Sequence, residues 1–288
     1  MRRASRGARI GEYMTVTNVV ETTMIWGTVS GASMVGMVIS LLLSVGLPIF
    51  LGIFIYKKTK AWVPAFFIGC GIFVGFAMIL EQICHAIVLT VTGDVIRDNI
   101  WLYAIYGGLA AALFEECGRW IAMKFCLKKH LIRENALMYG AGHGGIEAFL
   151  ILGMSSMSNL LTAAMINGGL MEKTMTALEP AQQEVTYHQL SVLWTTPAYQ
   201  FYLAPVERIS AIALQIALSI LVYSAVKTGR KLHLAAAFGL HFAVDFLTVI
   251  CAAAIPTWAL ELGLLLVVAV ICVVVYQLVY VQMAEKKA

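Results

Sequence analysis

Charged residues are scarce in this chain: only 12% of its 288 residues are Asp, Glu, Lys or Arg, whereas 60% are hydrophobic. Soluble globular domains carry about 25% charged residues. With a mean hydropathy of +0.84, the composition excludes a soluble enzyme or a soluble binding domain. It is typical of a protein built for the lipid bilayer.

Cysteine is sparse and follows no pairing pattern. The sequence contains no CxxC pair, so neither a disulfide framework nor a zinc-finger spacing is indicated. The six cysteines lie within or at the edge of long apolar runs, where they serve as small apolar residues. They are Cys70, Cys84, Cys117, Cys126, Cys251 and Cys272.

Long apolar runs make up most of the chain. A membrane-spanning helix needs about 20 mainly apolar residues, and seven stretches meet this length. They are residues 34–56, 62–90, 101–127, 136–160, 204–227, 232–254 and 258–282. Transmembrane strands are shorter and alternate in polarity. The runs therefore predict an all-α fold, a polytopic transmembrane helical bundle of about seven spans.

The few basic residues gather in alternate connections between these runs. Three short connections and the C-terminus hold most of them: Lys57, Lys58, Lys60, Lys128, Lys129, Arg133, Lys227, Arg230, Lys231, Lys286 and Lys287. The positive-inside rule then predicts a cytoplasmic C-terminus and an N-terminus outside. Because the net charge of +4 is explained by topology, we expect the bilayer as a partner and no nucleic acid.

The N-terminal tail opposes this orientation, because four of its first nine residues are arginines that would favour the cytoplasm. We expect the natural start to be Met14 or Met34. The expected organisation is an N-terminal extension over residues 1–33, poorly ordered or amphipathic, a single bundle domain over 34–288, and an outer-side loop over about 161–203.

Three of the runs contain ionisable side chains well inside the membrane. Each costs at least about 2.5 to 3.5 kcal/mol at the bilayer centre and should therefore face a partner or a cavity. The candidates are Glu115, Glu116, Arg119, His143, Glu147, His241 and Asp245. At 1.5 Å per residue, the acids and imidazoles all lie roughly 12 to 21 Å from the cytoplasmic ends of their spans. We expect them to form one layer.

The chemistry of this layer suits hydrolysis of a peptide bond. A glutamate in a mostly dry cavity binds a proton more readily, which suits it to act as a general base on water, and Arg119 would keep a second carboxylate ionised. His241, oriented by Asp245 or a neighbour, could donate to the developing oxyanion. Alternatively, a zinc ion bound by His143, Glu147, His241 and Glu115 could activate the water. The spacing does not distinguish the two mechanisms, since no HExxH pair is present.

At these residues the sequence resembles the glutamate-dependent intramembrane proteases of the CAAX prenyl protease and bacteriocin-processing superfamily, especially its PrsW-type and YhfC-type branches. Three motifs occur in the order of that superfamily: Glu115 and Glu116 with Arg119, His143 to Glu147, and His241 to Asp245. The segments 142–148 and 207–212 are similar to YhfC proteins in particular. At Gln215 the resemblance leads us to expect a histidine instead.

The resemblance implies roles for individual residues. Glu115 would activate the water with Glu116 as its supporting acid, Glu147 would position the water, and His241 with Asp245 would stabilise the oxyanion. The implied protein is an integral protein of the bacterial cytoplasmic membrane that cuts a peptide or transmembrane protein substrate, at a site opened toward the cytoplasm.

Two other functions remain open from the sequence. An ion- or proton-coupled transporter also needs buried acids and histidines, although no inverted repeat is visible. A non-catalytic membrane protein derived from a protease would keep the same motifs. Nearer the outer face, Glu81 and the pair Glu207 and Arg208 are interpreted as structural salt links.

Overall fold

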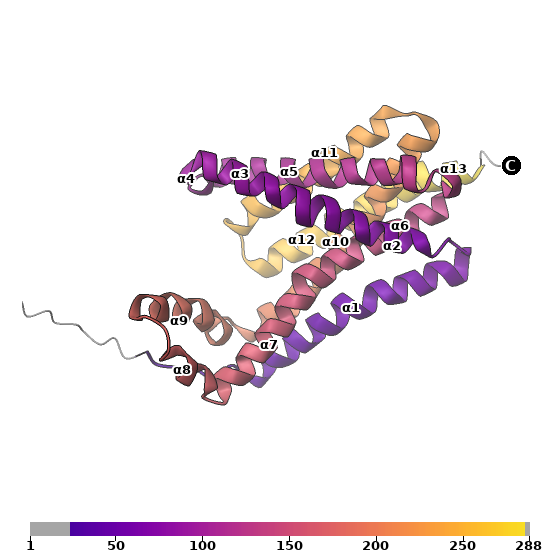
Figure 1. Ribbon diagram of the computed structural model, residues 1–288. Coiled ribbons are helices and arrows are strands. Elements are labelled where there is room, and N and C mark those ends of the chain that lie inside the picture. Colours follow the sequence, from indigo (N-terminus) through magenta and orange to yellow (C-terminus); the bar gives the residue numbers. More distant parts are fainter. Residues whose placement is uncertain (1–23, 286–288) are drawn as a thin grey trace, which may run out of the picture.

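The computed structural model describes residues 24–285, which form a bundle of long helices without a strand (Figure 1). Seven helical stretches are long and apolar enough to cross a membrane: Gly31–Thr59, Pro64–Thr92, Ile100–Cys126, Arg133–Asn167, Ala198–Thr228, Lys231–Ala252 and Thr257–Val281. The predicted all-α transmembrane bundle is confirmed, and each predicted span overlaps one of these helices.

Several spans are α-helices interrupted by short π-helical segments. The elements are α1 (Gly31–Thr59), α2 (Pro64–Phe73), η1 (Val74–Glu81), α3 (Gln82–Thr92), α4 (Asp94–Arg97), α5 (Ile100–Ile121), η2 (Ala122–Cys126), η3 (Lys128–His130), α6 (Arg133–Ala148), η4 (Phe149–Gly153), α7 (Met154–Asn167), α8 (Leu170–Met175), α9 (Pro180–Thr195), α10 (Ala198–Thr228), α11 (Lys231–Ala252), α12 (Thr257–Val275), η5 (Tyr276–Val281) and α13 (Gln282–Glu285). Of these, η3 is a 3₁₀ turn and the other η segments are π-helical.

Local sequence signals explain where the helices begin and end. The Ser30 hydroxyl accepts a hydrogen bond from the Ser33 amide at the start of α1, and Asn99 caps α5 through the amides of Trp101 and Leu102. At the other ends, Lys60 and Gly229 adopt left-handed backbone conformations that stop α1 and α10.

The segment 161–203 is mostly helical, although the sequence suggested a loop. Helix α7 continues to Asn167, and Gly169, with φ of 69°, separates it from α8. Pro180 opens α9 in the first-turn position that tolerates a missing amide. The long connection thus consists of α8, α9 and the ends of two spans. Most of the predicted extension 1–33 lies outside the described residues, and α1 already begins at Gly31.

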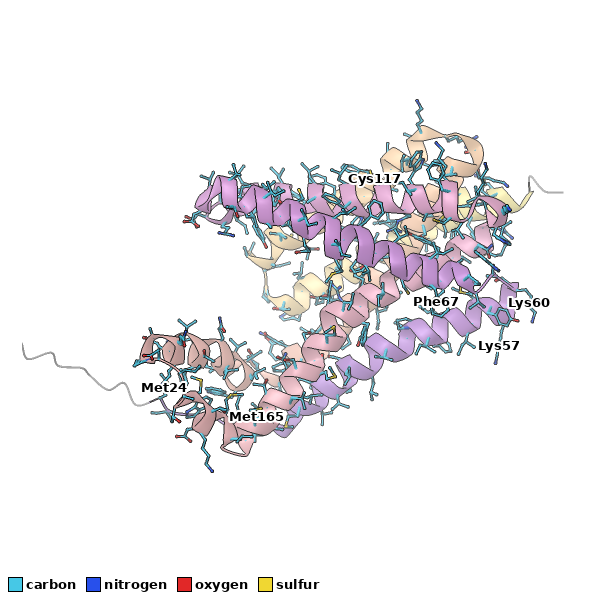
Figure 2. All side chains as sticks on the ribbon, in the orientation of Figure 1. Met24, Lys57, Lys60, Phe67, Cys117 and Met165 are labelled. Atoms are coloured by element: carbon cyan, nitrogen blue, oxygen red, sulfur yellow. The ribbon has the colours of Figure 1, made fainter. Side chains whose placement is uncertain are left out.

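The two ends of the bundle differ in charge. The connections 60–63, 127–132 and 229–230 lie at one end, here called the basic end, which Lys57 and Lys60 mark in Figure 2. The connections 93–99, 168–197 and 253–256 lie at the opposite, acidic end. Met24 and Met165 mark that end in the same view.

Helix α10 is the centre of the bundle. In its most apolar window 72% of the residues are buried, against 17 to 33% in the other six spans. Helix α6 packs between α10 and α2, α11 packs on α5, and α12 packs on α10. The spans that carry the candidate residues, α5, α6 and α11, therefore all surround or adjoin one central helix.

Glycines allow α2 and α6 to approach with their backbones in contact. A Cβ atom at Gly142 would lie 1.9 Å from the Phe66 carbonyl oxygen, and one at Gly69 would lie 2.2 Å from the Tyr139 carbonyl oxygen. The Cys70 thiol donates to the Gly142 carbonyl across the same contact, at 3.2 Å. Close packing of this kind is a common means of helix association in membranes, and here it fixes the position of the neighbouring His143.

We expect Gly142→Ala to destabilise the bundle, because the added methyl group meets backbone atoms that cannot rotate away. Overpacking of this kind costs about 1 to 3 kcal/mol, measurable as an earlier unfolding transition in detergent micelles. Gly71→Ala on α2 is the matched control, since nothing lies within 4 Å of its Cβ position. Equal unfolding transitions for the two variants would contradict this packing.

Candidate active site

The structure brings all seven predicted residues together in one connected cluster inside the bundle. Helix α5 carries Glu115, Glu116 and Arg119, and the contacts described below join them to residues of α6 and α11. All are buried except Asp245, which is partly exposed. The predicted layer is thus present as geometry, while the catalytic role of its members stays a prediction.

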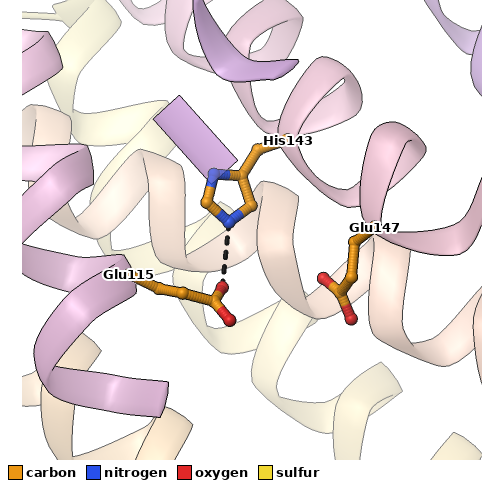
Figure 3. A group of neighbouring side chains, drawn as sticks. All are labelled: Glu115, His143 and Glu147. Atoms are coloured by element: carbon orange, nitrogen blue, oxygen red, sulfur yellow. Dashed lines mark hydrogen bonds and ion pairs between the residues drawn. The ribbon is translucent and has the colours of Figure 1, made fainter. Parts of the chain in front are cut away.

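Glu115 and His143 form the direct link between α5 and α6. The imidazole Nε2 lies 2.9 Å from Glu115 Oε2, and Figure 3 shows the carboxylate of Glu147 on the other side of this pair. His143 and Glu147 are one helical turn apart on α6, and both side chains point into the space next to Glu115. The sequence spacing had predicted this shared face.

His241 lies between three carboxylates. Its Nδ1 is 2.8 Å from Glu116 Oε1, while its Nε2 is 3.6 Å from Asp245 Oδ2 and 3.9 Å from Glu115 Oε2. Both ring nitrogens of His241 therefore face carboxylate oxygens. Glu116 makes the short contact that fixes the ring, a role for which the sequence had suggested Asp245 or a neighbour.

Arg119 supplies the positive charge at the centre of the layer and has no exposed surface. Its Nε lies 3.2 Å from Glu116 Oε2, and its Nη2 lies 4.0 Å from Glu115 Oε2. Its Nη1 donates to the Gln215 carbonyl at 2.7 Å and to the Ser219 hydroxyl at 2.8 Å. The guanidinium therefore ties α5 to the central helix and offsets buried negative charge.

Gln215 is the polar centre of the site. Its amide oxygen accepts from Arg119, while its Nε2 donates to Glu115 Oε2 at 2.9 Å and to Glu147 Oε2 at 2.8 Å. The amide thus donates to two carboxylates and accepts from a guanidinium, whereas a neutral imidazole has one donor and one acceptor. The glutamine that stands in place of the expected histidine can therefore hydrogen-bond to all three of these side chains.

Arg208 also belongs to this network, although the sequence suggested a structural link near the outer face. Its Nη1 donates to Glu147 Oε1 at 3.1 Å, and the same guanidinium bonds Glu207. The signal that could have revealed these contacts is periodicity. Arg208, Gln215 and Ser219 follow at spacings of seven and four, which places them on one stripe of an otherwise apolar helix.

One group in the described part of the chain has the geometry for a metal ion. Glu115, His143 and Glu147 each offer a ligand atom, and these atoms all lie within 4.8 Å of one another. Two carboxylate oxygens and one imidazole nitrogen fit zinc, which in catalytic sites takes three protein ligands and a water. His241 lies outside this group, although its Nε2 is 3.9 Å from Glu115 Oε2.

Comparison with known proteins gives two matches. Residues 43–272 match the model of a family described as YhfC intramembrane metalloprotease. The uncharacterized membrane protein YhfC of Bacillus subtilis (strain 168) is 42% identical over 204 residues, which cover 68% of this chain and 76% of that protein. No solved structure matches. The range 43–272 includes every residue of the site described above.

Proposed function

Because the chain belongs to the YhfC family of membrane proteins, we propose that it is an intramembrane endopeptidase that hydrolyses a membrane-embedded or membrane-adjacent peptide. The observation that carries the proposal is the convergence of Glu115, His143 and Glu147 within 4.8 Å in the buried centre of the bundle. These are the groups that bind and deprotonate water in hydrolases.

The attacking water would lie between the carboxylates of Glu115 and Glu147. Glu115 takes a proton from the water while the oxygen of the water bonds to the scissile carbonyl carbon. His143, 2.9 Å from Glu115, orients that carboxylate. The proton then passes to the amide nitrogen, whose bond to carbon breaks to release the amine product.

His241 would stabilise the negative charge that develops on the carbonyl oxygen. Its Nδ1 is held by Glu116, so that Nε2 faces the space next to Glu115 and Asp245. A fixed donor in a water-poor site stabilises an oxyanion without first having to reorganise. Glu116 acts through His241 and is therefore a positioning residue.

In the alternative, zinc-assisted mechanism, Glu115 would be a ligand and not the free base, and a zinc ion held by Glu115, His143 and Glu147 would polarise the scissile carbonyl and acidify the attacking water. The Gln215 amide donates to the same two carboxylate oxygens, Glu115 Oε2 and Glu147 Oε2. Its hydrogen bonds therefore compete with metal ligation at these atoms. For this chain, Gln215 tunes how tightly the group holds a cation.

Removal of the metal tests this assignment. Purified protein in proteoliposomes would be incubated with a panel of single-span membrane proteins tagged at both ends. We expect a chelator to lower cleavage at least tenfold and added zinc to restore it. We also expect His143→Ala to reduce the bound zinc from about one equivalent to a small fraction of that, measured by elemental analysis.

The control is His188→Ala, which removes an exposed imidazole on α9 far from the site in sequence and structure. It should retain both zinc and cleavage. Full cleavage by chelated protein would reject the zinc-assisted mechanism and keep the metal-free one. No product from any panel member, with zinc-loaded protein that is correctly folded, would reject the protease.

A further inference from the structure

Among the side chains of the site, those nearest the basic end are the least exposed. The side chain of Arg119 is 0% exposed and that of Glu116 is 2% exposed, whereas Glu147 reaches 11% and Asp245 reaches 35%. At about 1.5 Å per residue, Arg119 lies roughly 10 Å from the basic end of its span and Asp245 roughly 21 Å from the basic end of its own. Exposure within the site is therefore lowest on the side of the basic end.

An apolar layer fills the bundle between the site and the basic end. Its buried side chains come mainly from η2, α6 and α10, with others from α1, α2, α11, α12 and η5, and they form one hydrophobic cluster with almost no exposed surface. The largest are Met123, Leu127, Tyr139, Leu218 and Val222. Close-packed apolar side chains leave no space that water would occupy. The Tyr139 hydroxyl is buried without a hydrogen-bond partner in the described chain, but the rest of the layer is apolar, so it is a poor route for water and peptide to Glu115.

Ionisable side chains occupy the region on the other side of the site. Glu81 of η1 lies close enough to Asp245 and Glu115 to interact electrostatically with both, and Glu261 of α12 interacts with Glu207 and Arg208. Within a bilayer such groups need partners or water. Glu261 Oε2 is buried and has no hydrogen-bond partner within the described chain, so a water molecule is its natural partner.

The helices diverge in the same direction. Figure 1 shows α1 and α7, together with α8 and α9, running away from α3, α5 and α11, while the two groups converge at the basic end. The central helix reflects this divergence. Along α10, nearly every residue from 212 to 225 is buried, whereas most residues from 198 to 209 are partly exposed.

We propose that water and the peptide reach the carboxylates from the acidic end, past Glu207 and Arg208 of α10, Asp245 of α11 and Glu261 of α12. The bond that is cut would then lie in the half of the membrane next to the acidic end. By the positive-inside rule this is the outer half, opposite to the cytoplasmic opening suggested by the sequence. The water route stands by itself, and only the position of the cut bond rests on the proposed function.

Thiol labelling from one side of sealed vesicles tests the route. In a background with the six cysteines replaced by alanine, Ala211→Cys places a thiol on the stripe of Arg208 and Gln215, and Glu207→Cys places one nearer the entrance. A membrane-impermeant methanethiosulfonate reagent would be added to either side. Asp98→Cys at the acidic end and Lys129→Cys at the basic end report sidedness, since both positions are exposed.

We expect both Ala211→Cys and Glu207→Cys to react at least tenfold faster from the side that labels Asp98→Cys. Leu266→Cys is the control for exposure to lipid, because Leu266 is 68% exposed on the same helix as Glu261 but should not react with a reagent that needs water. Faster reaction from the side of Lys129→Cys, or no reaction in either variant while both references react, would overturn the route.

Ala211→Cys is a small change outside the hydrogen-bond network, so it keeps the test decisive if Glu207→Cys does not fold. Labelling does not depend on proteolysis. If labelling succeeds and no cleavage is found, the proposed function fails and the water route stands. If the tagged single-span proteins are cleaved at a bond in the half of the membrane next to the basic end, the proposed position of the cut bond is wrong.

Discussion

Glu115→Gln is expected to lower the rate of peptide cleavage by roughly 10²- to 10⁴-fold, the usual loss when a general base is removed. The amide has the same size as the carboxylate and can still accept hydrogen bonds from His143 and Gln215, which lie 2.9 Å from Glu115 Oε2. It cannot accept the proton of the attacking water. The loss should therefore appear in kcat with little change in folding.

Cleavage of the tagged single-span proteins by reconstituted protein measures this loss. Glu134→Gln is the matched control, because Glu134 pairs with Arg133 at the basic end, away from the site. The elution profile and unfolding transition of each variant report its folding. If Glu115→Gln folds normally and cleaves as fast as wild type, Glu115 is not the base, and the assignment of the site falls with it.

The depth of the ionisable layer could be predicted from the sequence alone. Counting residues from the basic connections placed Glu115, His143 and His241 at similar heights, and the i to i+4 spacing placed Glu147 and Asp245 on the same helix faces as their histidines. Rise per residue and helical periodicity are nearly constant. Both calculations therefore hold whatever surrounds the helix.

The rotation of each helix about its own axis could not be predicted in this way. Apolar residues surround these spans on all sides, since lipid and protein interior are equally apolar, so no hydrophobic stripe marks the inner face of α10. The contacts of Gln215 and Arg208 depend on that rotation. The polar stripe of α10 is visible in the sequence. The packing of the helices, however, determines which residues of α5 and α6 the stripe contacts.

The π-helical segments limit such counting further. A π-helical turn adds a residue to the turn and shifts the phase of every residue that follows. Glu81 is the last residue of η1, and η4 follows directly after Ala148, the end of α6. Spacing arguments carried across these segments would point side chains in the wrong direction. Nothing in the apolar sequences of η1 and η4 marks the change.

The site also determines how the bundle is held together. A membrane protein gains little from packing apolar helices against each other, because lipid offers the same environment. Here α5 is joined to α10 through Arg119, to α6 through Glu115 and to α11 through Glu116. The residues proposed for chemistry are therefore also the polar contacts between helices, and a variant that removes the buried guanidinium should destabilise the protein as well as inactivate it.

Arg119→Leu is expected to lower the free energy of unfolding by about 3 to 5 kcal/mol, the usual cost of removing one partner of a buried ion pair. Glu115 and Glu116 would lose the arginine that pairs with both of them, and the Gln215 carbonyl and Ser219 hydroxyl would lose a donor. Unfolding in mixed detergent micelles measures the change. Arg97→Leu is the control, since its exposed ion pair with Asp94 contributes little.

The double variant Arg119→Leu with Glu116→Gln separates charge from packing. If an uncompensated carboxylate causes the loss, removing that charge should return part of the stability, and the two effects will not add. If the lost hydrogen bonds to Gln215 and Ser219 dominate, the double variant will be no more stable than Arg119→Leu. A loss below about 1 kcal/mol for Arg119→Leu, within the range of exposed ion pairs, would contradict the buried ion network altogether.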